Sequence, residues 1–345
     1  MAFLKNAWYV AAWAEEVDRT PMARTLLGES VLMYRREDGQ AVAMGNRCPH
    51  RHAPLCDGRL VGDAIECPYH GLKFDTSGTC VDNPHGRHLI VPAMRVDSYT
   101  LVERYGALWI WMGDAAPDES LIPDFGVLND VAHYRTVRRH MMVEADYRLV
   151  ADNVLDLTHI VYVHKGIGGL GFLENESNET QQVGNQVWCR RRNEGIKAAP
   201  AYRAVVPDYN HILVDKQQNI RWDPPANLLL EIVHHETQKP DSLRTVNYGG
   251  NLLTPETEGR THYFWSVSRG YALDNEALDA AMEKGVNDAF AGEDKPIIEA
   301  QQRMMNLHGD QTPAPVLLET DVAAMRARRV LEGLIATEAK STAAH

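Results

Sequence analysis

Two short loops early in the chain each carry one cysteine and one histidine. The first loop reads Cys-Pro-His and the second reads Cys-Pro-Tyr-His, with sixteen residues between them. Thiolates and imidazoles are metal ligands, and the proline and glycine beside them are typical of tight loops. We therefore expect a metal centre with Cys48, His50, Cys67 and His70 as its ligands.

Two kinds of metal centre use two thiolates and two imidazoles. Zinc holds such a set in a tetrahedral site, usually with cysteine paired to cysteine and histidine to histidine along the chain. In a Rieske [2Fe–2S] cluster, both cysteines bind one iron and both histidines bind the other. Each loop here supplies one residue of each kind, which favours the Rieske cluster. A zinc site and a chance grouping of residues in turns are the alternatives.

A second polar group lies in an apolar stretch that is predicted to form a helix over 147–163, ended by glycines at 166, 168 and 169. Asn153, Asp156 and His159 are spaced i, i+3, i+6, so they would form one polar ridge on this helix. The residues around them are almost all apolar, which predicts a buried helix. Buried polar groups need partners or a role.

His159 and His164 are candidates for a shared metal ion. Five residues place two side chains about 140° apart on an ideal helix. They converge only if the helix loosens into a π-type turn or frays after His159. With a carboxylate they would complete the facial triad that holds non-haem Fe(II) and keeps open positions. Asp294, Glu293 and Asp288 could each supply that carboxylate, and spacing does not choose among them.

The elements that must position these ligands change character along the chain. The first third predicts β structure around an Asp38-Gly39 turn. A polar stretch with prolines follows, so we expect a domain over 1–115, a linker over 116–126 and a domain over 127–345. The expected strands cover 30–34, 41–44, 108–112, 227–233, 245–253 and 261–268, with a turn cluster over 255–259. The expected later helices cover 277–290, 297–307 and 322–335. Gly292 and Pro296 interrupt the first two of these helices, and a loose tail follows the third.

Composition excludes several classes of protein. The chain has 345 residues, with 35 lysines and arginines against 47 acids, a net charge of −12. This charge argues against nucleic acid or an anionic membrane as the partner. The sequence has no apolar run of bilayer length and no signal peptide pattern, so we expect a cytoplasmic protein. The number of cysteines, five, is odd and argues against a closed disulfide framework.

Together these motifs resemble the Rieske non-haem iron oxygenases. The resemblance covers most of the chain: the two Cys/His loops, the helix stretch over 152–159 with His164, and the Glu-Asp pair at 293–294. The branch to which it is most similar contains the oxygenase components of vanillate and dicamba O-demethylases. The stretches over 6–10, 253–258 and 293–295 are typical of that branch.

The resemblance implies a role for each residue of the second group. His159, His164 and Asp294 would ligate a mononuclear iron, and this is what selects Asp294 from the three acids. Asp156 would link the two metal sites by hydrogen bonds. Asn153 would lie beside the iron without firmly binding it.

The resemblance also implies an α+β fold of two domains. An all-β Rieske [2Fe–2S] domain would precede a catalytic domain in which an antiparallel sheet flanked by helices encloses the substrate, in a helix-grip-like arrangement. Three identical subunits would form a ring, and each Rieske cluster would serve the iron of its neighbour. In this ring the Asp156 carboxylate would accept hydrogen bonds from His159 and from His70 of the adjacent subunit.

The implied activity is that of a monooxygenase. A separate flavin/iron–sulfur reductase or a ferredoxin would deliver electrons from NAD(P)H, and O₂ would be the cosubstrate. We expect O-demethylation of a small methoxy-aromatic acid with release of formaldehyde; methyl or ring hydroxylation or N-demethylation of another aromatic compound is the alternative. A pure electron carrier is disfavoured by the second ligand set, and a zinc-dependent DNA regulator by the acidic charge.

The substrate pocket is the least defined part of the prediction. Alternation along the strand over 227–233 places Leu228, Leu230 and Ile232 on one face, which is either pocket or plain core. We find no arginine or lysine placed to bind a carboxylate in the stretches expected to line the pocket. His234 and His235 are the remaining candidates for that contact.

Overall fold

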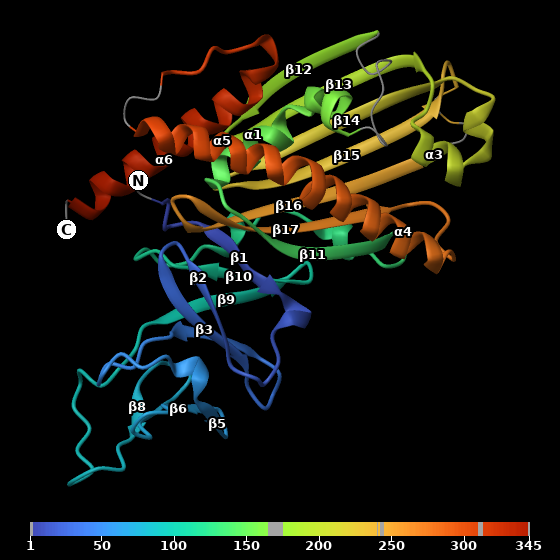
Figure 1. The fold of residues 1–345 in the computed structure, drawn as a ribbon. Coiled ribbons are helices and arrows are strands. Elements are labelled where there is room, and N and C mark those ends of the chain that lie inside the picture. Colours follow the sequence, from blue (N-terminus) through green and yellow to red (C-terminus); the bar gives the residue numbers. More distant parts are fainter. Residues whose placement is uncertain (1–2, 165–174, 240, 242–244, 310–312, 344–345) are drawn as a thin grey trace. The chain divides into compact units, whose positions relative to one another are not determined.

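A computed structural model describes residues 3–164, 175–239, 241, 245–309 and 313–343, so the glycines expected to end the first helix lie outside the described residues. The chain forms two compact units (Figure 1). The first comprises residues 1–122 and 254–257, and the second comprises residues 123–253 and 258–345. The expected bounds of 1–115, 116–126 and 127–345 stay a prediction. No helix among the described residues combines the length and the apolar character needed to cross a bilayer.

The first unit is built of antiparallel strands. One sheet has the order β1-β10-β9-β4-β3-β2, and a smaller sheet has the order β5-β6-β7-β8. Strands β1 and β10 are buried at every position, as expected for strands without polar alternation. The elements are β1 (Trp8–Trp13), η1 (Ala14–Glu16), β2 (Met22–Leu26), β3 (Glu29–Arg35), β4 (Ala41–Gly45), η2 (Leu55–Asp57), β5 (Arg59–Val61), β6 (Ala64–Glu66), β7 (Lys73–Phe74), β8 (Cys80–Asp82), β9 (Ser98–Arg104), β10 (Ala107–Trp111) and η3 (Glu119–Leu121).

The second unit is one antiparallel sheet of seven strands in the order β11-β17-β16-β15-β14-β13-β12. Its strands are β11 (Arg135–Val143), β12 (Glu176–Val183), β13 (Gln186–Ile196), β14 (Val214–Asp223), β15 (Asn227–Glu236), β16 (Thr245–Thr257) and β17 (Arg260–Arg269). Its helices are η4 (Gly126–Asn129), α1 (Tyr147–Leu155), η5 (Leu157–His159), α2 (Ile160–Val163), α3 (Pro200–Val205), η7 (Pro207–Asn210), α4 (Glu276–Asn287), α5 (Lys295–His308), η10 (Glu319–Asp321) and α6 (Val322–Ala343), with a π-helical segment, η8 (Asp288–Asp294), between α4 and α5.

The helices α1, α4 and α5 lie across one face of this sheet (Figure 1). Helix α4 contacts β11 and β17 at one edge, and α6 contacts β12 and β13 at the other. A sheet covered by helices on one face confirms the expected α+β class. The three strands expected in the second half of the chain are present as β15, β16 and β17.

Three expected boundaries are wrong. Strand β16 continues to Thr257, so the turn is shorter than the expected 255–259. Gly292 and Pro296 do not interrupt the helices, because the π-helical η8 joins α4 directly to α5. Gly292 lies within η8, and Pro296 is the second residue of α5. The last helix extends to Ala343, which leaves no loose tail of the expected length.

Candidate active site

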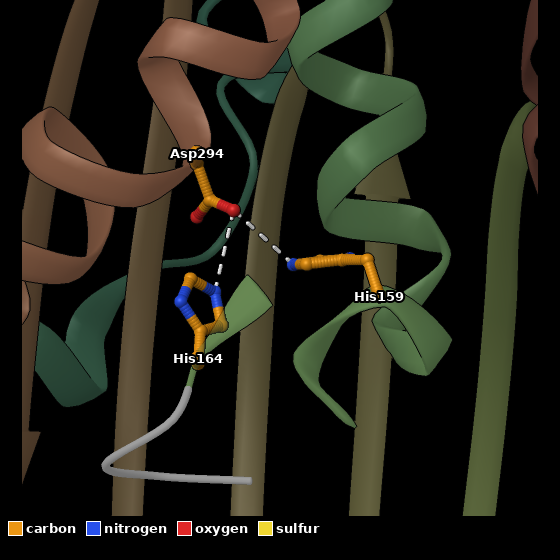
Figure 2. A group of neighbouring side chains, drawn as sticks. All are labelled: His159, His164 and Asp294. Atoms are coloured by element: carbon orange, nitrogen blue, oxygen red, sulfur yellow. Dashed lines mark ion pairs between the residues drawn. The ribbon is translucent and has the colours of Figure 1, made fainter. Parts of the chain in front are cut away.

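The side chains of His159, His164 and Asp294 point toward one another in the second unit (Figure 2). One donor atom from each lies within 4.8 Å of the other two. The Oδ1 atom of Asp294 is 3.4 Å from Nε2 of His159 and 3.3 Å from Nε2 of His164. A metal ion with bonds of about 2 Å places its ligand atoms roughly 3–4 Å apart. The three side chains are therefore spaced to hold one ion.

The two histidines meet because the helix breaks at Asp156. This residue has an extended backbone, with φ −115° and ψ 93°, and ends α1. Its carboxylate accepts hydrogen bonds from the N–H and the hydroxyl of Thr158, at 2.9 and 2.7 Å, and so begins η5. The expected continuous ridge of Asn153, Asp156 and His159 is therefore wrong. The helix breaks before His159, whereas we expected a π turn or fraying after it.

The π-type turn occurs on the other side of the site. Asp294 is the last residue of η8, and only 5% of its surface is exposed. Burial alone would raise the pKa of its carboxyl group, but the hydrogen bonds with His159 and His164 outweigh burial and hold this pKa below its ordinary value. Asp294 is therefore a carboxylate at neutral pH, as a metal ligand must be.

Each histidine is oriented through its second ring nitrogen. Nδ1 of His159 donates to the backbone carbonyl oxygen of Asp156 at 2.6 Å, and Nδ1 of His164 donates to Oε2 of Glu293 at 2.7 Å. Because Nδ1 makes this second contact, Nε2 can give up the proton that it donates to Asp294 and offer its lone pair to a metal instead. The expectation that the Asp156 carboxylate accepts from His159 is wrong, because the backbone carbonyl of Asp156 takes this hydrogen bond.

The remaining candidates occupy distinct positions. Asn153 lies beside the triad, with Nδ2 at 3.4 Å from Oδ1 of Asp294. Asp288 pairs with Lys284, and both side chains are exposed. The role of Glu293 was not foreseen in the sequence. In the π-helical turn the successive acids Glu293 and Asp294 both reach His164, but a Glu-Asp pair in a sequence does not reveal that turn.

The four residues of the first pair of loops lie together in the first unit. The loop of Cys48 follows β4 and the loop of Cys67 follows β6. Both cysteines are buried, and burial, followed by the hydrogen bond with Cys67, raises the pKa of Cys48 to about 11. The rings of His50 and His70 are 4.5 Å apart and more exposed to solvent. The loops thus present a pair of thiols on the inside and a pair of imidazoles on the outside.

This separation of the donors argues against zinc. Among the described residues, the one group of three or more donors that converge on a single ion is the His159–His164–Asp294 triad. Cys48, Cys67, His50 and His70 do not gather around one point as a tetrahedral zinc site requires. Two thiols on one side and two imidazoles on the other fit a cluster of two irons.

Comparison with known proteins gives the same assignment for both units. Residues 7–100 match the Rieske [2Fe-2S] domain, and residues 143–337 match the vanillate O-demethylase oxygenase C-terminal domain. The chain belongs to the family of Rieske non-haem iron oxygenases of the vanillate O-demethylase type. It is therefore an oxidoreductase, and its cofactors are a Rieske [2Fe–2S] cluster and a mononuclear iron.

Individual relatives of this oxygenase match along almost the whole chain. The oxygenase component of dicamba O-demethylase from Stenotrophomonas maltophilia is 36% identical over 98% of this chain and 100% of its own. The oxygenase component of chloroacetanilide N-alkylformylase from Rhizorhabdus wittichii is 36% identical over 98% of this chain and 97% of its own. A crystal structure of dicamba monooxygenase bound to dicamba is 36% identical and superposes with a TM-score of 0.92, covering 99% of this chain and 100% of that one.

The ligand sets of this oxygenase fit the two cofactors. His159, His164 and Asp294 would hold the mononuclear iron by two nitrogens and one oxygen, the donor set of a facial triad. Cys48 and Cys67 would hold one iron of the cluster, and His50 and His70 the other. The assignment of single residues to these irons is a prediction that the variants below test.

Replacing Glu293 by alanine is expected to weaken the retention of the mononuclear iron by about tenfold, because it removes the acceptor that orients His164. Iron retained after dialysis against a graded series of chelator concentrations measures this effect. Asp288→Asn is the control, since this neighbouring acid on η8 faces Lys284 instead. Equal iron retention in the Glu293→Ala variant and the parent would show that Glu293 does not support His164.

Proposed function

We propose that this oxygenase removes the methyl group of a methoxy-substituted aromatic acid. This proposal is supported by the His159–His164–Asp294 triad. It is also supported by the 36% identity of this chain to a dicamba O-demethylase oxygenase component over the full length of that relative. When iron is bound, it supplies the reductive activation of O₂. One oxygen atom enters a C–H bond of the methoxy group, and the resulting hemiacetal breaks down to a phenol and formaldehyde. The other oxygen atom leaves as water, with two electrons and two protons consumed.

The protein residues contribute geometry and charge to this reaction. His159, His164 and Asp294 would hold the iron by three donor atoms, a set that keeps positions open for O₂ and substrate in facial triads. Asp294 keeps its negative charge in a buried setting, and the Nδ1 contacts of His159 and His164 fix both rings. The helices over the sheet would limit the access of water to the reacting carbon.

Electrons would come from a separate protein, a flavin/iron–sulfur reductase or a ferredoxin that draws on NAD(P)H. This proposal is supported by the relatives, which are named as oxygenase components or oxygenase subunits. The cytoplasm is the compartment that supplies such a donor, and we propose it as the location of this oxygenase.

We further propose that three copies of the chain form a ring, in which Asp156 links the iron site of one subunit to His70 of the next. Asp156 is suited to this link because its backbone carbonyl holds His159 while its carboxylate lies on the same short turn. Asn153 would adjust the site from beside Asp294 without binding iron. Light scattering of the active protein should give the mass of a trimer, and an active monomer at working concentration would contradict the ring.

A second candidate function is oxidation of a different substrate group at the same iron site. Relatives of nearly equal identity are named as a chloroacetanilide N-alkylformylase and a toluene-4-sulfonate monooxygenase, at 36% and 35%. Methyl or ring hydroxylation or N-demethylation is therefore the alternative to O-demethylation.

The test is a screen of methoxybenzoates, N-methylanilines and toluene derivatives with a surrogate reductase and NADH. Equimolar formaldehyde and phenol from a methoxybenzoate is the expected result. A benzyl alcohol or a ring-hydroxylated product without formaldehyde would assign the second candidate instead. The His164→Ala variant serves as the negative control, and any formaldehyde that it releases is counted as background.

A further inference from the structure

A buried arginine attaches the turn that carries His159 to the sheet. Arg191 lies on β13 with 4% of its surface exposed, whereas its neighbour Arg192, on the opposite face of this strand, is exposed. Nη1 of Arg191 donates to the backbone carbonyl oxygen of Leu157, the first residue of η5, at 3.1 Å. Nη2 donates to Oε2 of Glu176 on β12 at 2.7 Å. One guanidinium group therefore joins two strands of the sheet to η5.

The turn η5 is short and does not continue α1. The backbone of Asp156 between them is extended, so the regular helix stops before the turn. A 3₁₀ turn of three residues has weak hydrogen-bond geometry of its own. The carbonyl oxygen of Leu157 accepts the N–H of Ile160 within the turn and a guanidinium N–H of Arg191 from the sheet. The contact with Arg191 is charge-assisted, which is the stronger kind of hydrogen bond.

The anchored carbonyl lies between the two functional side chains of the turn. Asp156 directly precedes Leu157, and His159 follows two residues later. Nδ1 of His159 donates to the backbone carbonyl oxygen of Asp156 at 2.6 Å, so its ring moves with the backbone of the turn. Oδ1 of Asp294 is 3.4 Å from Nε2 of the same ring. A shift of η5 along the sheet would therefore move this nitrogen relative to Asp294 and would carry the Asp156 carboxylate with it.

Stability alone does not explain why an ion pair is buried at this place. The side chains of Arg191 and Glu176 are 5% and 15% exposed. Removing two charges from water offsets much of their attraction, so a buried pair is often no more stable than apolar side chains of similar size. The contact with Leu157 is one that an apolar side chain could not make, and Glu176 neutralises the charge of the arginine that makes it. Nδ2 of Asn178 donates to the other oxygen of Glu176 at 2.5 Å and holds this carboxylate in place.

From these contacts we propose that Arg191 is a positioning residue of the iron site. It fixes η5 on the sheet and so sets where Nε2 of His159 and the carboxylate of Asp156 lie. The inference rests on the proposed assignment of the mononuclear iron to the triad. Arginine suits this role because its planar fork donates in two directions at once, here to a carbonyl and to a carboxylate. A lysine, whose ammonium group is a compact point charge, would match this pair of acceptors less well.

The test separates this positioning role from the stability of the buried pair. Arg191→Met removes both contacts and leaves Glu176 buried without its cation, so the midpoint of thermal unfolding should fall. Adding Glu176→Leu replaces the whole pair by apolar side chains and should return the midpoint close to that of the parent. The contact with Leu157 stays absent in this double variant, so any effect on η5 should persist while the stability recovers.

Two measurements on the holoenzyme report on η5 itself. Hydrogen–deuterium exchange of the backbone over 156–160 should be about tenfold faster in Arg191→Met and in the double variant than in the parent. The nitric oxide adduct of the ferrous iron should give a changed electron paramagnetic resonance signal in both variants, because His159 is displaced. Arg191→Lys, which can keep one of the two contacts, should show intermediate exchange.

Arg192→Met is the matched control, because Arg192 is the exposed arginine next along the same strand, and it should equal the parent in every measurement. The proposal is overturned if the double variant regains the exchange rate and the nitric oxide signal of the parent, since Arg191 would then serve only to pair with Glu176. It is also overturned if Arg191→Met leaves both measurements unchanged. The two proposals fail differently. Exchange over 156–160 needs no iron, so faster exchange in Arg191→Met together with a parent that gives no nitric oxide signal would contradict only the assignment of iron to the triad.

Discussion

Alanine at His159 or His164 is expected to remove the mononuclear iron and abolish turnover while the Rieske cluster stays in place. Each histidine directs Nε2 at the same point beside Asp294, so the loss of either leaves two ligands for the ion. The cluster ligands lie in the other compact unit and share no residue with the triad. Iron should fall from about three to about two atoms per chain.

Metal analysis, visible absorption and product assays measure these three outcomes together. His133→Ala is the matched control, since this histidine lies in the same unit but has a 74% exposed side chain that contacts Asp130. Its iron content and turnover should equal those of the parent. Loss of the red-brown colour in His159→Ala or His164→Ala would mean that the ligand sets are wrongly divided between the two units. Asp294→Ala should behave as the histidine variants do.

Asparagine at Asp156 is expected to reduce product formation by roughly 100-fold while both metal sites remain filled. The amide oxygen can still accept from the N–H of Thr158, so η5 and the position of His159 should persist. The backbone carbonyl that holds His159 is unchanged by the substitution. What is lost is the negative charge and half of the acceptor capacity at the proposed link to His70 of the adjacent subunit.

A single turnover followed by stopped flow measures this loss. The pre-reduced variant is mixed with substrate and O₂, and reoxidation of the cluster is recorded beside product yield. Thr158→Val separates the two roles of Asp156, because it removes a hydrogen bond to the carboxylate but keeps the charge; its reoxidation rate should stay near that of the parent. If the cluster of Asp156→Asn is reoxidised at the parent rate with full product yield, then Asp156 serves only to cap η5 through Thr158 and the proposed link is wrong.

The proposed ligand residues could be selected from the sequence because their chemistry is local. Cys48, His50, Cys67 and His70 occur as two short loops, and a cysteine or histidine beside proline and glycine has few structural reasons to recur in that order. His159 and His164 stood out because their surroundings are apolar. In each case the type of residue and its immediate neighbours were sufficient to make it a candidate ligand.

The way in which the ligands meet was not predictable from spacing. An i, i+3, i+6 pattern favours an unbroken helix, but the Asp156 carboxylate captures Thr158 and begins a new turn. Likewise, Gly292 and Pro296 indicate a helix break, yet the π-helical η8 continues the helix and brings both Asp294 and Glu293 to His164. Both outcomes depend on contacts between distant segments, which hydrophobic periodicity does not encode.

Strands β11 to β14 escaped prediction for a related reason. A half-buried strand is recognised by alternation of apolar and polar residues. In β13 and β14 the buried positions include Arg191, Asn193, Lys216 and Gln218, so that alternation is lost.

The metal content of the purified protein is the most direct test of the two assigned metal sites. We expect about three iron atoms and two acid-labile sulfides per chain, with the visible absorption of a Rieske cluster and no stoichiometric zinc. Two of these irons should stay when His164 is replaced, and the third should leave. Stoichiometric zinc in a colourless protein would contradict the assignment of both sites.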